Sequence, residues 1–126
     1  GQRESAMEEA GLMEFVLPYP PSINHYWRRV GPRTLISREG RRFRERVTAI
    51  LAALGIRPVH GRLAVHVDVF PPDRRRRDID NCLKSLLDAL QHGGAYADDS
   101  QIVRLTIEKC EPVEGGKTVV RIERAE

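Results

Sequence analysis

The side chains best suited to chemistry gather in residues 73–81, whose sequence is DRRRRDIDN. Consecutive arginines repel one another, so the run favours a position beside an anion such as a phosphate. Asp78 and Asp80 come directly after the run and flank one apolar residue. In an extended segment the side chains at i and i+2 point to the same side, so both carboxylates can converge on one ion. The arginines that would contact phosphates are Arg74, Arg75, Arg76 and Arg77.

A second pair of acids, Asp98 and Asp99, precedes a later predicted strand, and the intervening helix and loop could return it to the first pair. Carboxylates held together repel each other unless a hard cation lies between them, and Mg²⁺ or Mn²⁺ takes oxygen ligands of this kind. Such an ion would activate water for phosphodiester hydrolysis. Lys84 lies one helical turn after Asp80 and would stabilise transition-state charge or protonate the leaving oxygen. The pattern indicates a metal-dependent phosphodiesterase site.

The same residues also fit a protein without catalytic activity. Asp78 or Asp80 can cap a helix, and Lys84 can form an ion pair with the cap. Asp98 and Asp99 can be ordinary turn residues, and the arginine run can be a solvated loop or a surface that binds nucleic acid without cutting it. A non-catalytic, structure-selective DNA-binding protein is therefore the alternative function. A phosphoesterase of small nucleotides is disfavoured, because the sequence has no glycine-rich phosphate loop.

Composition restricts the class of protein further. The chain has 126 residues, of which 40% are apolar and 31% charged, and this suits one domain with one core. The formal net charge of +3 is spread unevenly, because residues 1–15 hold one arginine and four glutamates. The rest of the chain is basic, which favours an anionic partner, although a basic surface also serves solubility. No apolar run approaches the roughly 20 residues of a membrane span, and residues 1–15 lack signal-peptide features, so we expect a cytoplasmic protein.

The cysteines and histidines show no metal-binding spacing. Cys82 and Cys110 lie far apart, which suits a reducing compartment and predicts no zinc site. The four histidines are scattered, and we expect them to be surface or partly buried residues rather than metal ligands. They are His25, His60, His66 and His92.

The elements that must position the acidic and basic residues can be predicted from hydrophobic periodicity and turn residues. Alternation predicts strands at 13–17, 63–70, 102–108 and 118–123, with a short one at 34–36. Gly115-Gly116 predicts a hairpin turn between the last two long strands.

Helical spacing predicts two helices. One begins at the N-cap Ser37 and ends at Gly55, and the other covers 81–91, where Asp80 or Asn81 can cap it. The first has an arginine face that we expect to be solvated, formed by Arg41, Arg42, Arg44 and Arg46. We therefore expect an α+β fold, in which residues 1–11 are a flexible tail and residues 12–126 form one domain. Its mixed β-sheet would carry the helices on one face.

Three blocks of the sequence together resemble the RusA family of Holliday-junction resolvases. They are residues 17–27 (LPYPPSINHYW), the 73–81 block with Lys84, and residues 96–102 (YADDSQI), in the order and spacing of that family. The resemblance covers about residues 13–124. It implies a small Mg²⁺- or Mn²⁺-dependent homodimeric endonuclease of bacteria or their phages. It also implies that the substrate is branched DNA, and that opposing strands of four-way junctions are nicked during recombination and repair.

The resemblance also implies roles for individual residues. Asp78, Asp80 and Asp99 would bind the metal, and Lys84 would be the essential basic group. Residues of the first block would face the DNA together with the arginine run, although turn structure and packing explain them equally well. These first-block residues are Asn24, Tyr26 and Arg28. A homodimer would place two active sites about a two-fold axis, as the paired cuts require.

Overall fold

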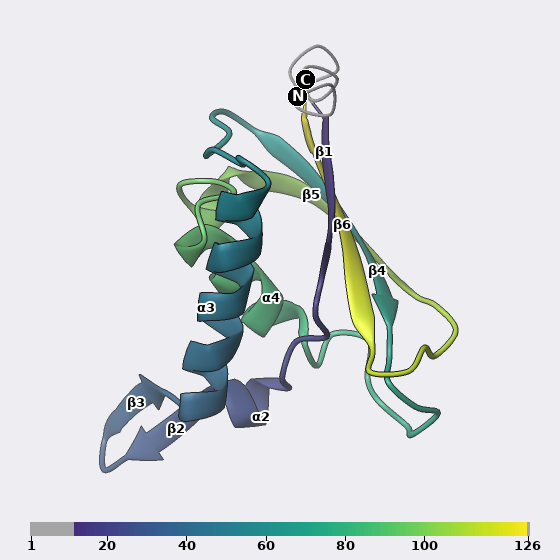
Figure 1. Ribbon diagram of the computed structural model, residues 1–126. Helices are drawn as coiled ribbons and strands as arrows, with labels where there is room; N and C mark the ends of the chain where they lie inside the picture. Colours follow the sequence, from purple (N-terminus) through teal and green to yellow (C-terminus); the bar gives the residue numbers. More distant parts are fainter. Residues whose placement is uncertain (1–11, 126) are drawn as a thin grey trace.

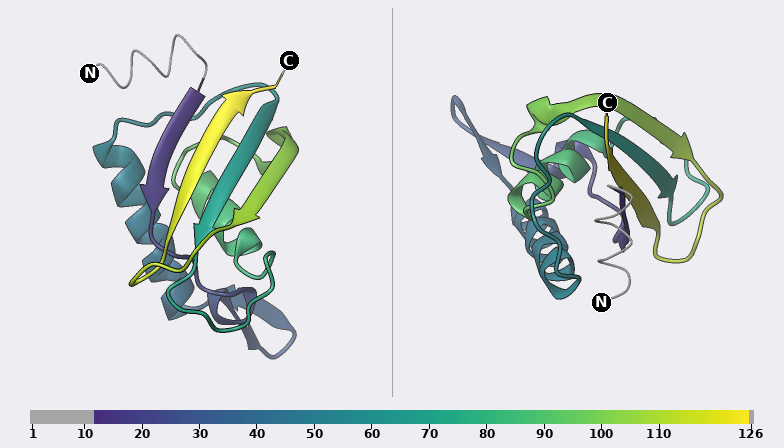
Figure 2. Two further views of the ribbon diagram at one scale, coloured as in Figure 1. Left: turned by 90° about the vertical axis from the view of Figure 1, so that its right-hand side faces the viewer. Right: turned by 90° about the horizontal axis from the view of Figure 1, so that it is seen from above.

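Residues 12–125 are described by a computed structural model, and the expected flexible tail at 1–11 lies outside them. Strands β1, β6, β4 and β5 form a four-stranded sheet in that order, and β4 and β5 are parallel whereas the other pairs are antiparallel. Helices α3 and α4 lie on one face of this sheet (Figure 1). Seen from the other side, no helix formed by residues 12–125 covers the sheet (Figure 2). The α+β expectation of a mixed sheet with helices on one face is confirmed.

The four long strands coincide closely with the alternating segments of the sequence. Their bounds are β1 (Leu12–Leu17), β4 (Leu63–Phe70), β5 (Ile102–Lys109) and β6 (Lys117–Arg124). A separate two-stranded sheet is formed by β2 (Trp27–Val30) and β3 (Arg33–Ile36). The helices are α2 (Ile23–Tyr26), α3 (Arg38–Ala53), α4 (Leu83–His92) and the 3₁₀ turn η1 (Asp99–Gln101). None of these helices has the length and apolar character needed to cross a membrane.

The core lies between the sheet and the two long helices. Helix α3 contributes Val47 and Leu51, which recur at helical spacing, and both are fully buried. Helix α4 contributes Leu86 and Leu90 in the same way. The inward face of β4 supplies alternating aliphatic side chains, as expected for a strand with one covered face. These aliphatic side chains are Leu63, Val65, Val67 and Val69.

The expected hairpin between the last two strands is wrong. Strand β6 pairs with β4 and β1, and β5 pairs with the other side of β4. Alternate residues of β6 are buried, which suits a central strand, whereas most of β5 is exposed, which suits an edge. The connection after β5 therefore runs beside the end of β4, where Val113 N donates to Pro71 O at 2.9 Å. Gly115-Gly116 still turns the chain, with both residues at positive φ.

The N-terminus of α3 is fixed to the segment before it. Ser37 caps the helix as predicted: its Oγ accepts a hydrogen bond from Gly40 N at 2.9 Å and donates to Tyr26 O at 2.9 Å. At Gly40 a Cβ would lie 2.4 Å from Tyr26 O, so only glycine permits this approach. Helix α4 begins later than expected. Its N-cap position is Cys82, and neither Asp80 nor Asn81 caps it, because those residues form the preceding turns.

A polar network joins α2, α3 and α4. The Tyr26 hydroxyl donates to the Asp88 carboxylate, and Arg44 donates to the same oxygen through Nη2 at 2.8 Å and Nε at 3.0 Å. Burial, and then the hydrogen bond to Asp88, raises the pKa of Tyr26 far above its ordinary value. The solvated arginine face expected on α3 is therefore wrong at Arg44, which is partly buried, although Arg41, Arg42 and Arg46 are exposed.

The network predicts unequal effects for two arginines on the same helix. Arg44→Ala should lower the free energy of unfolding by about 1–3 kcal/mol, because Asp88 would keep a partly buried charge without its cation. Arg42→Ala removes an exposed side chain of the same type and should change stability by no more than about 0.5 kcal/mol. Urea unfolding monitored by circular dichroism measures both. Equal reductions in stability would show that the network adds none.

Candidate active site

The loop between β4 and α4 carries the arginine run and is folded around Asp73. The Asp73 carboxylate accepts hydrogen bonds from Arg75 N at 2.9 Å and from Arg77 Nη1 at 2.7 Å. These bonds, that from Arg77 first, lower the pKa of Asp73 to about 2. Arg77 also lies 5.9 Å from the centre of the Tyr19 ring, and Lys109 Nζ donates to Arg77 O at 2.8 Å. Arg77 therefore stabilises the conformation of the loop between β4 and α4.

The other three arginines of the run, Arg74, Arg75 and Arg76, are exposed. Arg74 lies 3.3 Å from the exposed carboxylate of Glu111, and Arg75 lies 3.9 Å from Asp73. Exposed pairs of this kind contribute little energy and exchange readily for a phosphate. These three side chains are accessible to a nucleic-acid backbone.

Asp78 and Asp80 occupy two successive turns in front of α4. Asn81 N donates to Asp78 O at 3.1 Å, and Leu83 N donates to Asp80 O at 3.1 Å. Both aspartates are exposed, and within residues 12–125 neither carboxylate pairs with a cation or accepts a hydrogen bond. Lys84 is also exposed, in the first turn of α4. Two unpaired carboxylates suit the oxygen ligand set of Mg²⁺ or Mn²⁺.

The first block of the sequence is attached directly to this acidic turn. Ile23 N, at the start of α2, donates to Asn81 O at 3.0 Å. Asn24 and Arg28 are exposed, as DNA-facing residues must be. Tyr26 is 0% exposed and its hydroxyl is used by Asp88, so the expectation that it contacts DNA is corrected to a structural role.

The hairpin of β2 and β3 carries exposed arginines. The sequence predicted only part of it, the short strand at 34–36. The hairpin projects from the N-terminal end of α3, at the same end of the molecule as the arginine loop (Figures 1 and 2). Besides Arg28 it exposes Arg29 and Arg33, and among residues 12–125 no acid forms an ion pair with these three side chains. In the sequence, the Gly31-Pro32 turn with arginines on both sides could have indicated this hairpin.

Asp99 lies at the opposite end of α4 from Asp78 and Asp80. Its N–H donates to Gln91 Oε1 at 2.9 Å, near the C-terminus of the helix. Partial burial raises the pKa of the Asp99 carboxyl, and the charges of Asp88 and Asp98 add to this rise, whereas the Tyr96 hydroxyl and His92 act against it. Asp98 caps η1 by accepting a hydrogen bond from Ser100 N at 2.9 Å. The acids near Asp99 are thus Asp88 and Asp98, and not those of the acidic turn.

The three carboxylates expected to share one ion therefore do not meet within one chain. The ten residues of α4 span about 15 Å, and they separate Asp99 from the acidic turn. In the described part of the chain, one set of three potential ligands has its donor atoms within 4.8 Å of one another, and it consists of His66, Asp68 and Glu108 on the sheet. The structure keeps Asp78 and Asp80 in consecutive turns before α4 and places Asp99 apart.

Comparison with known proteins gives a consistent assignment. The family model described as Endodeoxyribonuclease RusA matches residues 18–123. The crossover junction endodeoxyribonuclease rusA of Enterobacteria phage HK97 is 42% identical over 114 residues, which cover 90% of this chain and 95% of the relative. The crossover junction endodeoxyribonuclease RusA of Shigella sonnei is 42% identical over 111 residues, covering 84% and 89%. The protein of that name in Escherichia coli K12 is 40% identical over 111 residues, with the same coverage. This chain belongs to the RusA family of endodeoxyribonucleases.

Proposed function

We propose that this protein is a Mg²⁺-dependent endodeoxyribonuclease that resolves four-way DNA junctions by paired symmetric nicks, with Mn²⁺ as a possible substitute for Mg²⁺. It would act in the cytoplasm of a bacterial cell, during recombination and repair. The observation that carries the proposal is the acidic turn. Asp78 and Asp80 present bare carboxylates directly after exposed arginines, in a chain whose relatives are named as crossover junction endodeoxyribonucleases.

Each side chain of the turn then has a distinct task. Asp78 and Asp80 would hold the cation, which supplies an activated water and neutralises phosphate charge when bound. Arg74, Arg75 and Arg76 would hold the flanking phosphates, and Arg77 would keep their loop in shape through Asp73. The Lys84 ammonium is placed in the first turn of α4, where it would stabilise the charge that develops on the cleaved phosphate.

A homodimer would resolve the separation of Asp99 from the acidic turn. We propose that Asp99 completes the metal site of the partner subunit rather than its own. Strand β5 comes directly after η1 and is an edge of the sheet. On this strand Val103 is 47% exposed, and Leu105, the partner of the inward-facing Val65, is 38% exposed. An edge strand with uncovered apolar side chains is a surface that a second copy can cover, and a two-fold axis there would create two equal sites.

The DNA would lie across the end of the molecule that carries both basic features. The arginine loop would contact the backbone on one side of the acidic turn, and the β2–β3 hairpin would contact it on the other. The hydrogen bond from Ile23 N to Asn81 O holds the two features in a fixed relation. Two separate backbone contacts suit a branched substrate, whose arms diverge from one point.

The alternative is a non-catalytic protein that binds branched DNA. The separation of Asp99 from Asp78 and Asp80 favours it, because a single chain does not assemble three carboxylates around one ion. The two functions differ in their products. A binding protein would retain a junction without any metal-dependent cut, whereas a resolvase would convert it to nicked duplexes.

Cleavage of a cruciform plasmid tests the proposed reaction. With Mg²⁺ the protein should convert the supercoiled plasmid to linear DNA, because both strands are cut within one bound complex, and without a divalent ion it should cut nothing. Asp80→Asn should reduce cleavage by about 10³-fold or more through loss of the cation. It should bind the junction as well as or better than the unaltered protein, because a repulsive charge is removed.

Glu45→Gln provides the matched control, since it neutralises an exposed acid on α3 and should leave cleavage unchanged. Gel electrophoresis separates supercoiled, nicked and linear plasmid. Nicked circles without linear product would argue against paired cuts. Normal cleavage by the Asp80→Asn variant would overturn the site assignment.

Mixed dimers test whether Asp99 acts across the subunit boundary. Asp80→Asn and Asp99→Asn should each be inactive alone. In a heterodimer of the two variants, one site would have all three carboxylates and the other would lack two. The mixture should therefore regain nicking of one strand, seen as nicked circles. If Asp99 acted within its own chain, both heterodimer sites would be defective and no activity would return.

The hairpin predicts a salt-dependent contribution to DNA binding. Replacing Arg28 and Arg29 by glutamine should weaken junction binding and reduce the slope of log K against log salt by about 0.9 for each phosphate that is no longer neutralised. Replacing Arg57 and Arg62, exposed arginines between α3 and β4 at the far end of α3, is the control and should leave the slope unchanged. Fluorescence anisotropy at several salt concentrations measures both. Equal slopes for the two double variants would exclude the hairpin as a DNA-binding element.

A further inference from the structure

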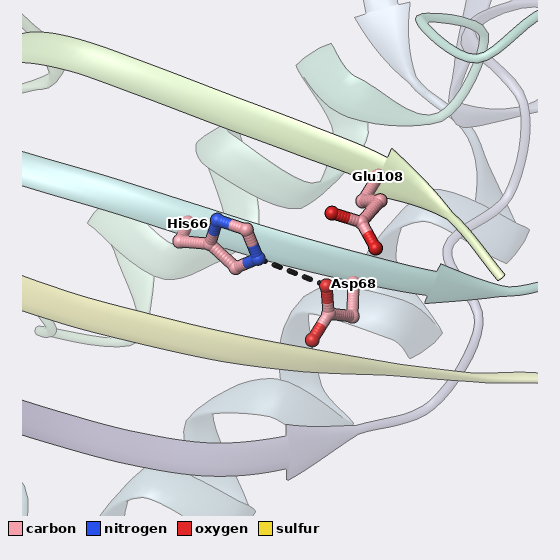
Figure 3. Close-up of side chains that lie close together, drawn as sticks. All are labelled: His66, Asp68 and Glu108. Carbon is pink, nitrogen blue, oxygen red and sulfur yellow. Dashed lines mark hydrogen bonds and ion pairs between the residues drawn. The ribbon is translucent and has the colours of Figure 1, made fainter.

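The uncovered face of the sheet carries a cluster of possible metal ligands that includes no residue of the acidic turn. His66 and Asp68 project from β4, and Glu108 projects from the neighbouring strand β5 (Figure 3). Their donor atoms all lie within 4.8 Å of one another. Helix α4 lies behind the opposite face of the sheet, so the cluster shares no side chain with the proposed nuclease site.

The register of the sheet explains why these three residues meet. His66 and Asp68 are two apart on one strand, so they point to the same face. Asp68 and Glu108 are direct partners in the parallel pairing of β4 and β5. Nothing in the spacing of residues 66, 68 and 108 along the chain indicates this arrangement, which is why the sequence predicted no metal ligand among the histidines.

The distances suit coordination of a single ion. His66 Nε2 lies 2.9 Å from Asp68 Oδ1. Two ligands about 2.1 Å from one metal at right angles to each other are separated by about 3 Å, so both atoms can bind one ion with little rearrangement. The side chains of His66 and Asp68 are only 25% and 26% exposed, and they stand on a central strand. Their positions are thus largely set before any ion binds.

The electrostatics of the cluster favour a cation. Like charges placed directly opposite on neighbouring strands destabilise a sheet, and Asp68 and Glu108 are such a pair. Within residues 12–125 no arginine or lysine forms an ion pair with either of them. Arg121, the partner of His66 on β6, is 3.8 Å from Glu14 instead.

We propose that His66, Asp68 and Glu108 form a second divalent-metal site that selects a transition ion such as Zn²⁺, Co²⁺ or Mn²⁺. An imidazole nitrogen beside two carboxylates suits these ions better than Mg²⁺, which prefers oxygen ligands. Three protein ligands leave further positions to water. Because the ligands come from β4 and β5, the ion would fasten the edge strand to the centre of the sheet and stabilise the folded chain. This proposal does not depend on junction cleavage.

Binding of Co²⁺ alone to the EDTA-treated, full-length protein tests the proposal. Isothermal titration and the visible absorption of Co²⁺ should report a site that is retained in Asp80→Asn, which lacks a ligand of the proposed nuclease site. His66→Gln and Glu108→Gln should each weaken this binding by at least about tenfold. His60→Gln and Glu114→Gln, which change an exposed histidine and an exposed acid elsewhere, should bind like the unaltered protein.

Two further readouts keep the result clear. Circular dichroism should show that each variant is folded before titration, and Mn²⁺ should broaden the amide NMR signals around residues 66, 68 and 108 even in Asp80→Asn. The proposal is overturned if His66→Gln and Glu108→Gln bind Co²⁺ as the unaltered protein does. It is also overturned if Asp80→Asn loses all binding, because the ion would then belong to the nuclease site.

Discussion

The arrangement of the candidate active site depends on one carboxylate that takes no part in its chemistry. Asp88 accepts hydrogen bonds from Arg44 on α3 and from Tyr26 on α2, and it belongs to α4 itself. Helices α2 and α3 are thereby fixed to α4, which lies far from both in the sequence. Since α2 in turn donates to Asn81, the network extends to the turn that presents Asp78 and Asp80. A partly buried ion pair of this kind contributes modest stability but strictly limits how its elements can be arranged.

The exposed arginines and the unpaired acids of the molecule are concentrated in a few places rather than spread evenly over its surface. Exposed arginines occupy the loop after β4 and the β2–β3 hairpin, and the bare acids follow the arginine loop directly, in the turn that is hydrogen-bonded to α2. Acids in such a place would repel a polyanion, so their position is reasonable only if a cation accompanies the DNA. One net charge for the whole chain, +3, hides this contrast. On the uncovered face of the sheet, Asp68 and Glu108 are likewise two neighbouring acids whose repulsion a cation would relieve.

Local pattern was sufficient to predict the four long strands and the Ser37 cap, because each depends on neighbours in the sequence. The order of the strands was not predictable in this way. The Gly115-Gly116 turn gave the same local signal as a hairpin, and only the pairing of β6 on both of its sides decides that it lies between β4 and β1. Tyr26 and Arg44 looked like surface residues because their common partner, Asp88, is distant in sequence. His66 was missed as a possible ligand for the same reason: its proposed co-ligand Glu108 is distant in sequence and lies near it because β5 pairs with β4.

Helix α4 also fixes the distance and the rotation that relate the acidic turn to Asp99. It separates the acidic turn at its start from Asp99 beyond its end, and it packs through Leu86 and Leu90. Each residue added to a helix rotates the remainder of the chain by about 100° and advances it by about 1.5 Å. A one-residue insertion in α4 would therefore swing Asp99 to another side of the molecule while leaving every proposed ligand chemically intact. In evolution the length of this helix should be held as strictly as the identity of the acids.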